Sequence, residues 1–167
     1  DYVTQTKESQ SNMTPKSALQ MLKDGNDRFA AGKSIERDLT EQIKQTSKGQ
    51  YPFATILSCI DSRVSSELVF DQGIGDVFNA RIAGNIVDED VLGSLEFATK
   101  IMGSKVILVL GHSSCGAIKG ACDDAHMGNL TALLSKIKPS VDAVSSDNTD
   151  RTSKNHDFVE KVAKENV

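Results

Sequence analysis

The chain has 167 residues, a length that suits one globular domain with a substantial buried core. Its formal net charge is −4 and no segment is dense in Lys and Arg, so the composition argues against a nucleic acid partner. The longest apolar run, Val106 to Leu110, is far too short for a membrane span, and 3 cysteines are an odd number that does not make a disulfide framework.

The amino-terminal part of the chain combines a polar segment with a helix. Residues 1–13 are rich in Ser, Gln and Thr, and we expect them to form a flexible arm ahead of a single domain over residues 14–167. Thr14 followed by Pro15 is typical of a helix start, and the apolar spacing after it predicts an amphipathic helix that ends near Gly32. This helix would be an amino-terminal helical arm of the domain.

The rest of the chain alternates strands with helices. Apolar and β-branched runs that end in polar residues predict strands, and apolar residues three and four positions apart predict helices. The predicted strands cover residues 53–57, 77–82 and 105–110. The predicted helices cover residues 39–45, 67–70, 88–102, 115–121, 130–137 and 157–165, and residues 140–155 are predicted to form a polar loop. The alternation favours an α/β fold of three layers, α-β-α, with a mainly parallel central sheet.

Each predicted strand runs directly into residues with distinctive chemistry. These residues are Cys59, Asp61 and Arg63 after the first strand, Gly84 and Asn85 after the second, and His112 and Cys115 after the third. Ligands of parallel α/β sheets bind beyond the carboxyl ends of the strands, where all of these residues would meet. The sequence therefore predicts one functional site at that edge of the sheet.

Four of these residues have the side chains of metal ligands. Cys59, His112 and Cys115 offer two sulfurs and one nitrogen, and Asp61 offers a carboxylate oxygen. Zn²⁺ accepts this mixture in tetrahedral geometry, so a zinc ion is the predicted cofactor. If Asp61 leaves the metal, water can take the open position, and Arg63 can hold the released carboxylate in a bidentate pair. Because two thiolates offset the charge of the ion, we expect activity to rise toward alkaline pH.

Simpler interpretations of these residues stay open at this point. The zinc site could be buried and purely structural, or two ordinary core cysteines could lie beside an unrelated histidine. Asp61 and Arg63 could form only a structural ion pair. The third cysteine, Cys122, is expected to be a small buried apolar residue, and no Cys-x-x-Cys pair supports a thiol oxidoreductase.

The motifs together make the chain resemble the β-class carbonic anhydrases. The resemblance rests on Cys59-Ile-Asp61-Ser-Arg63, on His112-Ser-Ser-Cys115-Gly116, and on Gly75-Asp-Val-Phe78, Arg81, Gly84-Asn85 and Gly93-Ser-Leu-Glu96 between them. It implies the reversible hydration of carbon dioxide to bicarbonate and a proton by zinc-bound hydroxide. This is the activity of a carbonate dehydratase, a zinc lyase with one zinc ion per subunit.

The resemblance also implies a role for each matched residue. The implied zinc ligands are Cys59, His112 and Cys115. Asp61, paired with Arg63, is implied to accept a hydrogen bond from the hydroxide and to orient it toward the carbon. The implied substrate contacts are the amide of Gln50, the aromatic ring of Phe78 and the backbone N–H of Gly116.

Further implications concern assembly, chain ends and location. The resemblance implies a homodimer or homotetramer in which the helix after Thr14 embraces the partner subunit. Family members usually continue beyond the position of Val167 with a helix and a strand, so we expect this chain to be short at its carboxyl end and to lack a sheet strand. The chain begins at Asp1 rather than Met, so an exported, periplasmic protein with its signal removed is one interpretation and a cytoplasmic protein is the alternative.

Two other functions would use the same zinc site. A related hydrolase of carbon disulfide or carbonyl sulfide would direct the same nucleophile at another linear substrate. A zinc-stabilised interaction module without turnover would keep Asp61 on the metal. The effect of replacing Asp61 on carbon dioxide hydration separates this module from the enzyme.

Overall fold

The computed structural model describes residues 3–145 and 150–167, which form two compact units. Unit 1 contains the chain through Leu57 together with Arg63–Ala80 and Glu89–Leu108. Unit 2 contains Ser58–Ser62, Arg81–Asp88 and the chain from Val109 onward. The single domain that the sequence predicted over residues 14–167 stays a prediction.

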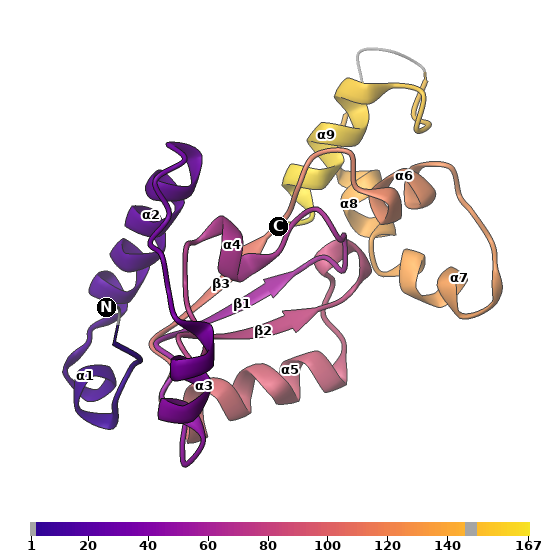
Figure 1. The fold of residues 1–167 in the computed structure, drawn as a ribbon. Helices are drawn as coiled ribbons and strands as arrows, with labels where there is room; N and C mark the ends of the chain where they lie inside the picture. The colour runs from indigo at the N-terminus through magenta and orange to yellow at the C-terminus, as the bar shows by residue number, and fades with distance from the viewer. Residues whose placement is uncertain (1–2, 146–149) are drawn as a thin grey trace. The chain divides into compact units, whose positions relative to one another are not determined.

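The described residues form helices and strands that alternate along the chain (Figure 1). The strands are β1 (Ala54–Ser58), β2 (Val77–Arg81) and β3 (Val106–Leu110). The helices are α1 (Lys7–Asn12), α2 (Pro15–Ala30), α3 (Leu39–Thr46), α4 (Ser66–Val69), α5 (Glu89–Glu96), α6 (Gly116–Cys122), α7 (Gly128–Ser135), α8 (Lys138–Ala143) and α9 (His156–Glu165). Two shorter helical turns are η1 (Ala83–Asn85) and η2 (Phe97–Ile101). Among the described residues, no helix combines the length and the apolar character that crossing a bilayer requires.

The parallel sheet has β1 at its centre, between β2 and β3. Every residue of β1 is buried, whereas β2 and β3 are partly exposed. The chain passes from β1 to β2 on one side and then to β3 on the other side of β1. Because crossovers between parallel strands are right-handed, the two steps put α4 and α5 on opposite faces of the sheet (Figure 1). The three-layer α/β fold predicted from the sequence is confirmed.

The first described residues of unit 1 form a helix where the sequence suggested a flexible arm. The hydroxyl of Thr6 accepts a hydrogen bond from the N–H of Ser9, and the Ser9 hydroxyl accepts one from the N–H of Thr6, which closes a capping box on α1. The side-chain amide of Gln10 is buried and donates to the carbonyl oxygens of Pro52 at 2.7 Å and Met102 at 2.9 Å. Polar contacts order this segment, and residues 1–2 lie outside the described part.

The predicted helix start at Thr14 and Pro15 is confirmed in α2. Gly25 brings this helix close to the end of α4, because a Cβ at that position would lie 1.8 Å from the carbonyl oxygen of Phe70. Only glycine permits that approach, since any side chain would overlap the backbone.

A buried ion-pair cluster follows α4 in unit 1. The Asp71 side chain is 2% exposed, and its two carboxylate oxygens pair with Nε of Arg28 and Nη1 of Arg37. The backbone N–H of Ile35 donates to the same carboxylate. Burial alone would raise the pKa of Asp71, but the two guanidinium groups and this N–H outweigh burial and hold the pKa below its usual range.

Two predicted elements differ from the structure. The helix expected over residues 88–102 changes to a π-helical turn, η2, in its last part. The hydroxyl of Thr99 donates to the carbonyl oxygen of Leu95 at 2.8 Å and so competes with the regular backbone bond. The loop expected over residues 140–155 is wrong at its start, because α8 continues through Ala143 and its Val141 is buried. Residues 146–149 of that loop lie outside the described residues.

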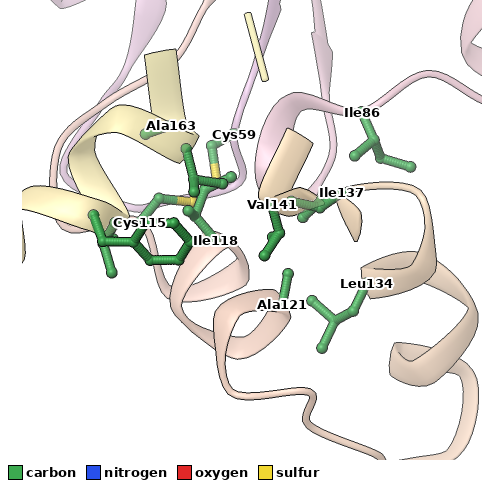
Figure 2. Packing of buried hydrophobic residues seen from close by; sticks show 12 residues of the cluster. Cys59, Ile86, Cys115, Ile118, Ala121, Leu134, Ile137, Val141 and Ala163 are labelled. Atoms are coloured by element: carbon green, nitrogen blue, oxygen red, sulfur yellow. The ribbon is translucent and has the colours of Figure 1, made fainter. Parts of the chain in front are cut away.

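The core of unit 2 is an apolar cluster built by α6 to α9 and the loops that precede them (Figure 2). Its buried members are Cys59, Ile86, Cys115, Ile118, Ala121, Leu134, Ile137, Val141, Phe158, Val159, Val162 and Ala163. Two of these residues are the candidate metal ligands Cys59 and Cys115. The packing of unit 2 therefore fixes the backbone on which the predicted site is built.

Candidate metal centre

The three sulfur and nitrogen ligands predicted from the sequence come together in unit 2. Cys59 directly follows β1, His112 follows β3 by two residues, and Cys115 is the residue before the first turn of α6. One ligand atom from each lies within 4.8 Å of the others. The two Sγ atoms are 3.9 Å apart, and Figure 2 shows them side by side.

The imidazole of His112 is oriented to present one nitrogen to this cluster. Nδ1 lies 2.8 Å from the carbonyl oxygen of Ser113. A carbonyl can only accept, so Nδ1 carries the hydrogen and Nε2 carries a lone pair. Nε2 is buried and has no hydrogen-bond partner among the residues that the structure describes. Buried polar atoms are nearly always paired, so an unpaired nitrogen beside two thiols fits a metal ion as its missing partner.

The two thiols differ in how readily they ionise. Burial opposes the ionisation of Cys59, but hydrogen bonds to its sulfur, among them those from the backbone N–H groups of Gly84 and Asp61, outweigh burial and lower the pKa of this thiol. Burial raises the pKa of Cys115, and the adjacent Cys59 raises it further. A cation bound between the sulfurs would favour the ionised form of both thiols, so metal binding would release their protons.

The loop that carries Cys59 is fixed by Arg81 at the end of β2. Nε of Arg81 donates to the carbonyl oxygen of Cys59 at 2.8 Å, and Nη2 donates to that of Asp61 at 2.6 Å. The N–H of Gly84 also donates to Sγ of Cys59 at 3.4 Å. Gly84 has φ +70 and a Cβ there would lie 2.6 Å from Cδ1 of Ile137, so this position requires glycine.

The turn that carries His112 and Cys115 contains a residue in the left-handed region. Ser114 has φ +53, a conformation that costs a non-glycine residue about 1 to 3 kcal/mol. Its N–H donates to Oε1 of Glu160 on α9 at 2.9 Å. Asn166, which directly follows α9, donates from Nδ2 to the carbonyl oxygen of Gly84 at 2.7 Å. Neither Glu160 nor Asn166 stands out in the sequence, because their contacts join residues 46 and 82 positions apart.

The remaining predicted site residues divide between the two units. In unit 2, Oδ2 of Asp61 lies 3.8 Å from Nε2 of His112, although Asp61 is not part of the three-residue metal group. Gly116 begins α6, and open space lies where its side chain would stand. Gln50, Arg63 and Phe78 belong to unit 1, so their predicted roles stay predictions.

Two comparisons with known proteins match this arrangement. The family model for carbonic anhydrase matches residues 54–167, which include all three candidate ligands. A solved β-carbonic anhydrase from Coccomyxa, in complex with acetazolamide, has a TM-score of 0.67 at 25% identity, over 90% of this chain and 66% of that chain. The chain belongs to the β-class carbonic anhydrase family. The resemblance stated from the sequence motifs is confirmed.

Curated β-carbonic anhydrase relatives and further structures support this membership. Carbonic anhydrase 2 of Mycobacterium tuberculosis is 40% identical over 136 residues, which are 78% of this chain and 66% of that protein. A chain from the crystal structures of two tetrameric β-carbonic anhydrases of Sordaria macrospora has a TM-score of 0.64 at 25% identity, over 90% of this chain and 77% of that chain. The chain spans just under two thirds of the length of the mycobacterial relative.

Proposed function

We propose that this chain is a zinc-dependent carbonate dehydratase, which catalyses the reversible hydration of carbon dioxide to bicarbonate and a proton. One observation carries the proposal: the unpaired Nε2 of His112 lies beside two buried thiols in a member of the β-carbonic anhydrase family. The donor set suits a borderline-soft ion, and Zn²⁺ is the ion that most often takes two sulfurs and one nitrogen. The relatives named carbonic anhydrase support the choice of substrate.

In this proposal Cys59, His112 and Cys115 hold the metal. When bound, zinc lowers the pKa of a water molecule and so supplies a nucleophile at neutral pH. Asp61 accepts a hydrogen bond from this nucleophile and orients it, which its position 3.8 Å from Nε2 of His112 supports. Arg63 pairs with the Asp61 carboxylate and keeps it from occupying the open metal position.

The substrate contacts in this proposal begin at α6. The N–H of Gly116 lies at the amino end of that helix, beside open space, and would donate to an oxygen of carbon dioxide or bicarbonate. Gln50 and Phe78 would add an amide donor and an apolar wall. We further propose a homo-oligomer, a dimer or tetramer, which the tetrameric relatives support.

Carbon dioxide hydration followed by stopped flow tests the proposal. The protein is stripped with a chelator, reloaded with zinc and compared with Asp61→Asn and with a control, Asp124→Asn, whose side chain is 78% exposed. We expect hydration to require zinc and to fall about 100-fold in Asp61→Asn, because the neutral amide accepts a weaker hydrogen bond from the nucleophile and no longer forms an ion pair with Arg63. The control should match the wild type. Zinc binding without any hydration would contradict the proposed activity, and full activity in Asp61→Asn would contradict the role of Asp61.

A further inference from the structure

We propose that α9 holds both ligand-bearing loops of the metal centre in place, with Glu160 and Asn166 as positioning residues for metal binding. The inference rests on the metal site in the proposed function but not on carbon dioxide as the substrate. Neither residue is near enough in sequence to the ligands to act through local structure. Each acts on the backbone of a loop that carries or contacts a ligand.

Glu160 fixes the turn between His112 and Cys115. Its Oε1 accepts the N–H of Ser114 at 2.9 Å, and its side chain is 28% exposed, so the contact is partly shielded from water. Ser114 has φ +53, which a serine rarely adopts. A hydrogen bond from an N–H to a carboxylate is stronger than one to a neutral acceptor, so it can hold this conformation. The turn then keeps the side chains of His112 and Cys115 directed toward the same metal position.

Asn166 acts on the other loop through Gly84. Its Nδ2 donates to the carbonyl oxygen of Gly84 at 2.7 Å, and the N–H of Gly84 donates to Sγ of Cys59 at 3.4 Å. The side-chain amide thus orients a residue that contacts the ligand sulfur. Hydrogen bonds to metal-binding thiolates and the groups that orient them tune both affinity and geometry.

The helix itself is a rigid support for these two contacts. Its side chains Phe158, Val159 and Val162 are no more than 1% exposed and belong to the apolar core of unit 2. The loop before His112 also passes close to the helix end, because a Cβ on Gly111 would lie 2.7 Å from Cγ2 of Val167. A single packed element therefore contacts both ligand loops, and this lowers the ordering cost of metal binding.

Zinc affinity, measured by competition with a chromogenic chelator at fixed pH, tests this role directly. We expect Glu160→Ala and Asn166→Ala to weaken zinc binding about 10- to 100-fold, the usual loss when an outer-shell partner is removed. Glu160→Gln should stay within about threefold of wild type, because its amide oxygen can accept the same bond. The matched control is Glu165→Ala, an exposed carboxylate on the same helix, which should leave the affinity unchanged.

Thermal unfolding of the metal-free variants separates positioning from general stability. Affinities within about threefold of wild type for both alanine variants would overturn the inference, whatever their unfolding temperatures. If Asn166→Ala does not fold, Asn166→Asp replaces it, since it keeps the size but puts an oxygen acceptor in place of the Nδ2 donor. Loss of zinc affinity together with a wild type that binds zinc but does not hydrate carbon dioxide would support the inference and contradict the proposed function.

Discussion

Two buried polar clusters, one in each unit, show what distinguishes a structural site from a binding site. At Asp71 in unit 1, both carboxylate oxygens are paired with guanidinium nitrogens from Arg28 and Arg37. In the cluster of Cys59, His112 and Cys115 in unit 2, Nε2 of His112 is buried, and no group in the described part of the chain forms a hydrogen bond with it. The Asp71 carboxylate is neutralised by two cationic side chains of the same chain. The metal cluster instead consists of two sulfurs and one nitrogen that could each act as a metal ligand, and it contains no cation.

The pKa shifts of Asp71 and Cys115 express the same difference. Burial disfavours the charged form in both, but cationic partners reverse this at Asp71 and lower its pKa. At Cys115 burial raises the pKa, and the neighbouring thiol raises it further. Burial of an acid is thus offset at Asp71, where the protein supplies cations, and is not offset at Cys115, where the cation has to come from solution.

Replacing a predicted metal ligand should have the largest effect of the substitutions considered, and the effect should be on bound zinc. In Cys59→Ser we expect bound zinc to fall from about one ion per chain to a trace, because a serine hydroxyl is a poor ligand for this ion. Carbon dioxide hydration should fall to the uncatalysed rate. Metal analysis of purified protein checks this, with Cys122→Ser as the control, since Cys122 lies outside the metal group. Stoichiometric zinc in Cys59→Ser would contradict the ligand assignment.

Breaking the Asp71 cluster should instead lower stability and spare the metal. Asp71→Asn leaves two guanidinium groups without their counter-charge, and the Arg37 side chain is only 6% exposed. We expect the free energy of unfolding to fall by about 3 kcal/mol in urea titrations, the loss typical of a broken buried ion pair.

Zinc affinity serves as the second measurement on Asp71→Asn and should match the wild type. The control is Asp142→Asn, which removes an ion pair with Lys138 whose side chains are 62% and 48% exposed. It should cost less than about 0.5 kcal/mol. An equal loss in both variants, or a loss of zinc in Asp71→Asn, would mean that the two clusters are not distinct.

A smaller effect is expected in the pH dependence of stability. The folded pKa of Asp71 lies below the unfolded value of about 3.9, so the unfolded state binds more protons between these two values. The stabilisation is complete above the unfolded pKa and is lost as the pH falls through the folded pKa. Urea titrations of metal-free protein from about pH 5 to pH 2 should therefore show the gap between wild type and Asp71→Asn closing. A constant gap would contradict the lowered pKa.

The local patterns of the sequence were enough to predict the strands, most helices and the three members of the metal group. Cys59 and His112 follow directly after β1 and β3, so strand prediction and residue chemistry together locate them. Local patterns do not predict contacts between residues that are far apart in the sequence. Glu160 reaches the turn at Ser114 across 46 positions, and no periodicity in α9 indicates this partner.

Helices α1 and α8 were not predicted, because polar residues and proline occur in helices as well as in loops. Residues Lys7–Asn12 have no apolar stripe, yet α1 forms because a capping box and the buried Gln10 side chain supply its contacts. The polar composition from residue 140 onward suggested a loop, but Pro139 suits the first turn of a helix, and α8 covers Lys138–Ala143. The zinc ion, the Asp61–Arg63 pair and the substrate contacts of Gln50, Phe78 and Gly116 stay predictions.

The contacts of Gln10 determine which substitutions the amino-terminal region of unit 1 can tolerate during evolution. Its amide donates both of its hydrogen bonds to main-chain carbonyls, at Pro52 and Met102. A main-chain acceptor is the same whatever side chain stands at that position, so mutations at 52 and 102 need not disturb the contact. Gln10 is thus the residue of α1 whose side chain fixes this helix to the rest of unit 1. A substitution at position 10 would release the helix as a unit, while many substitutions around it would be neutral.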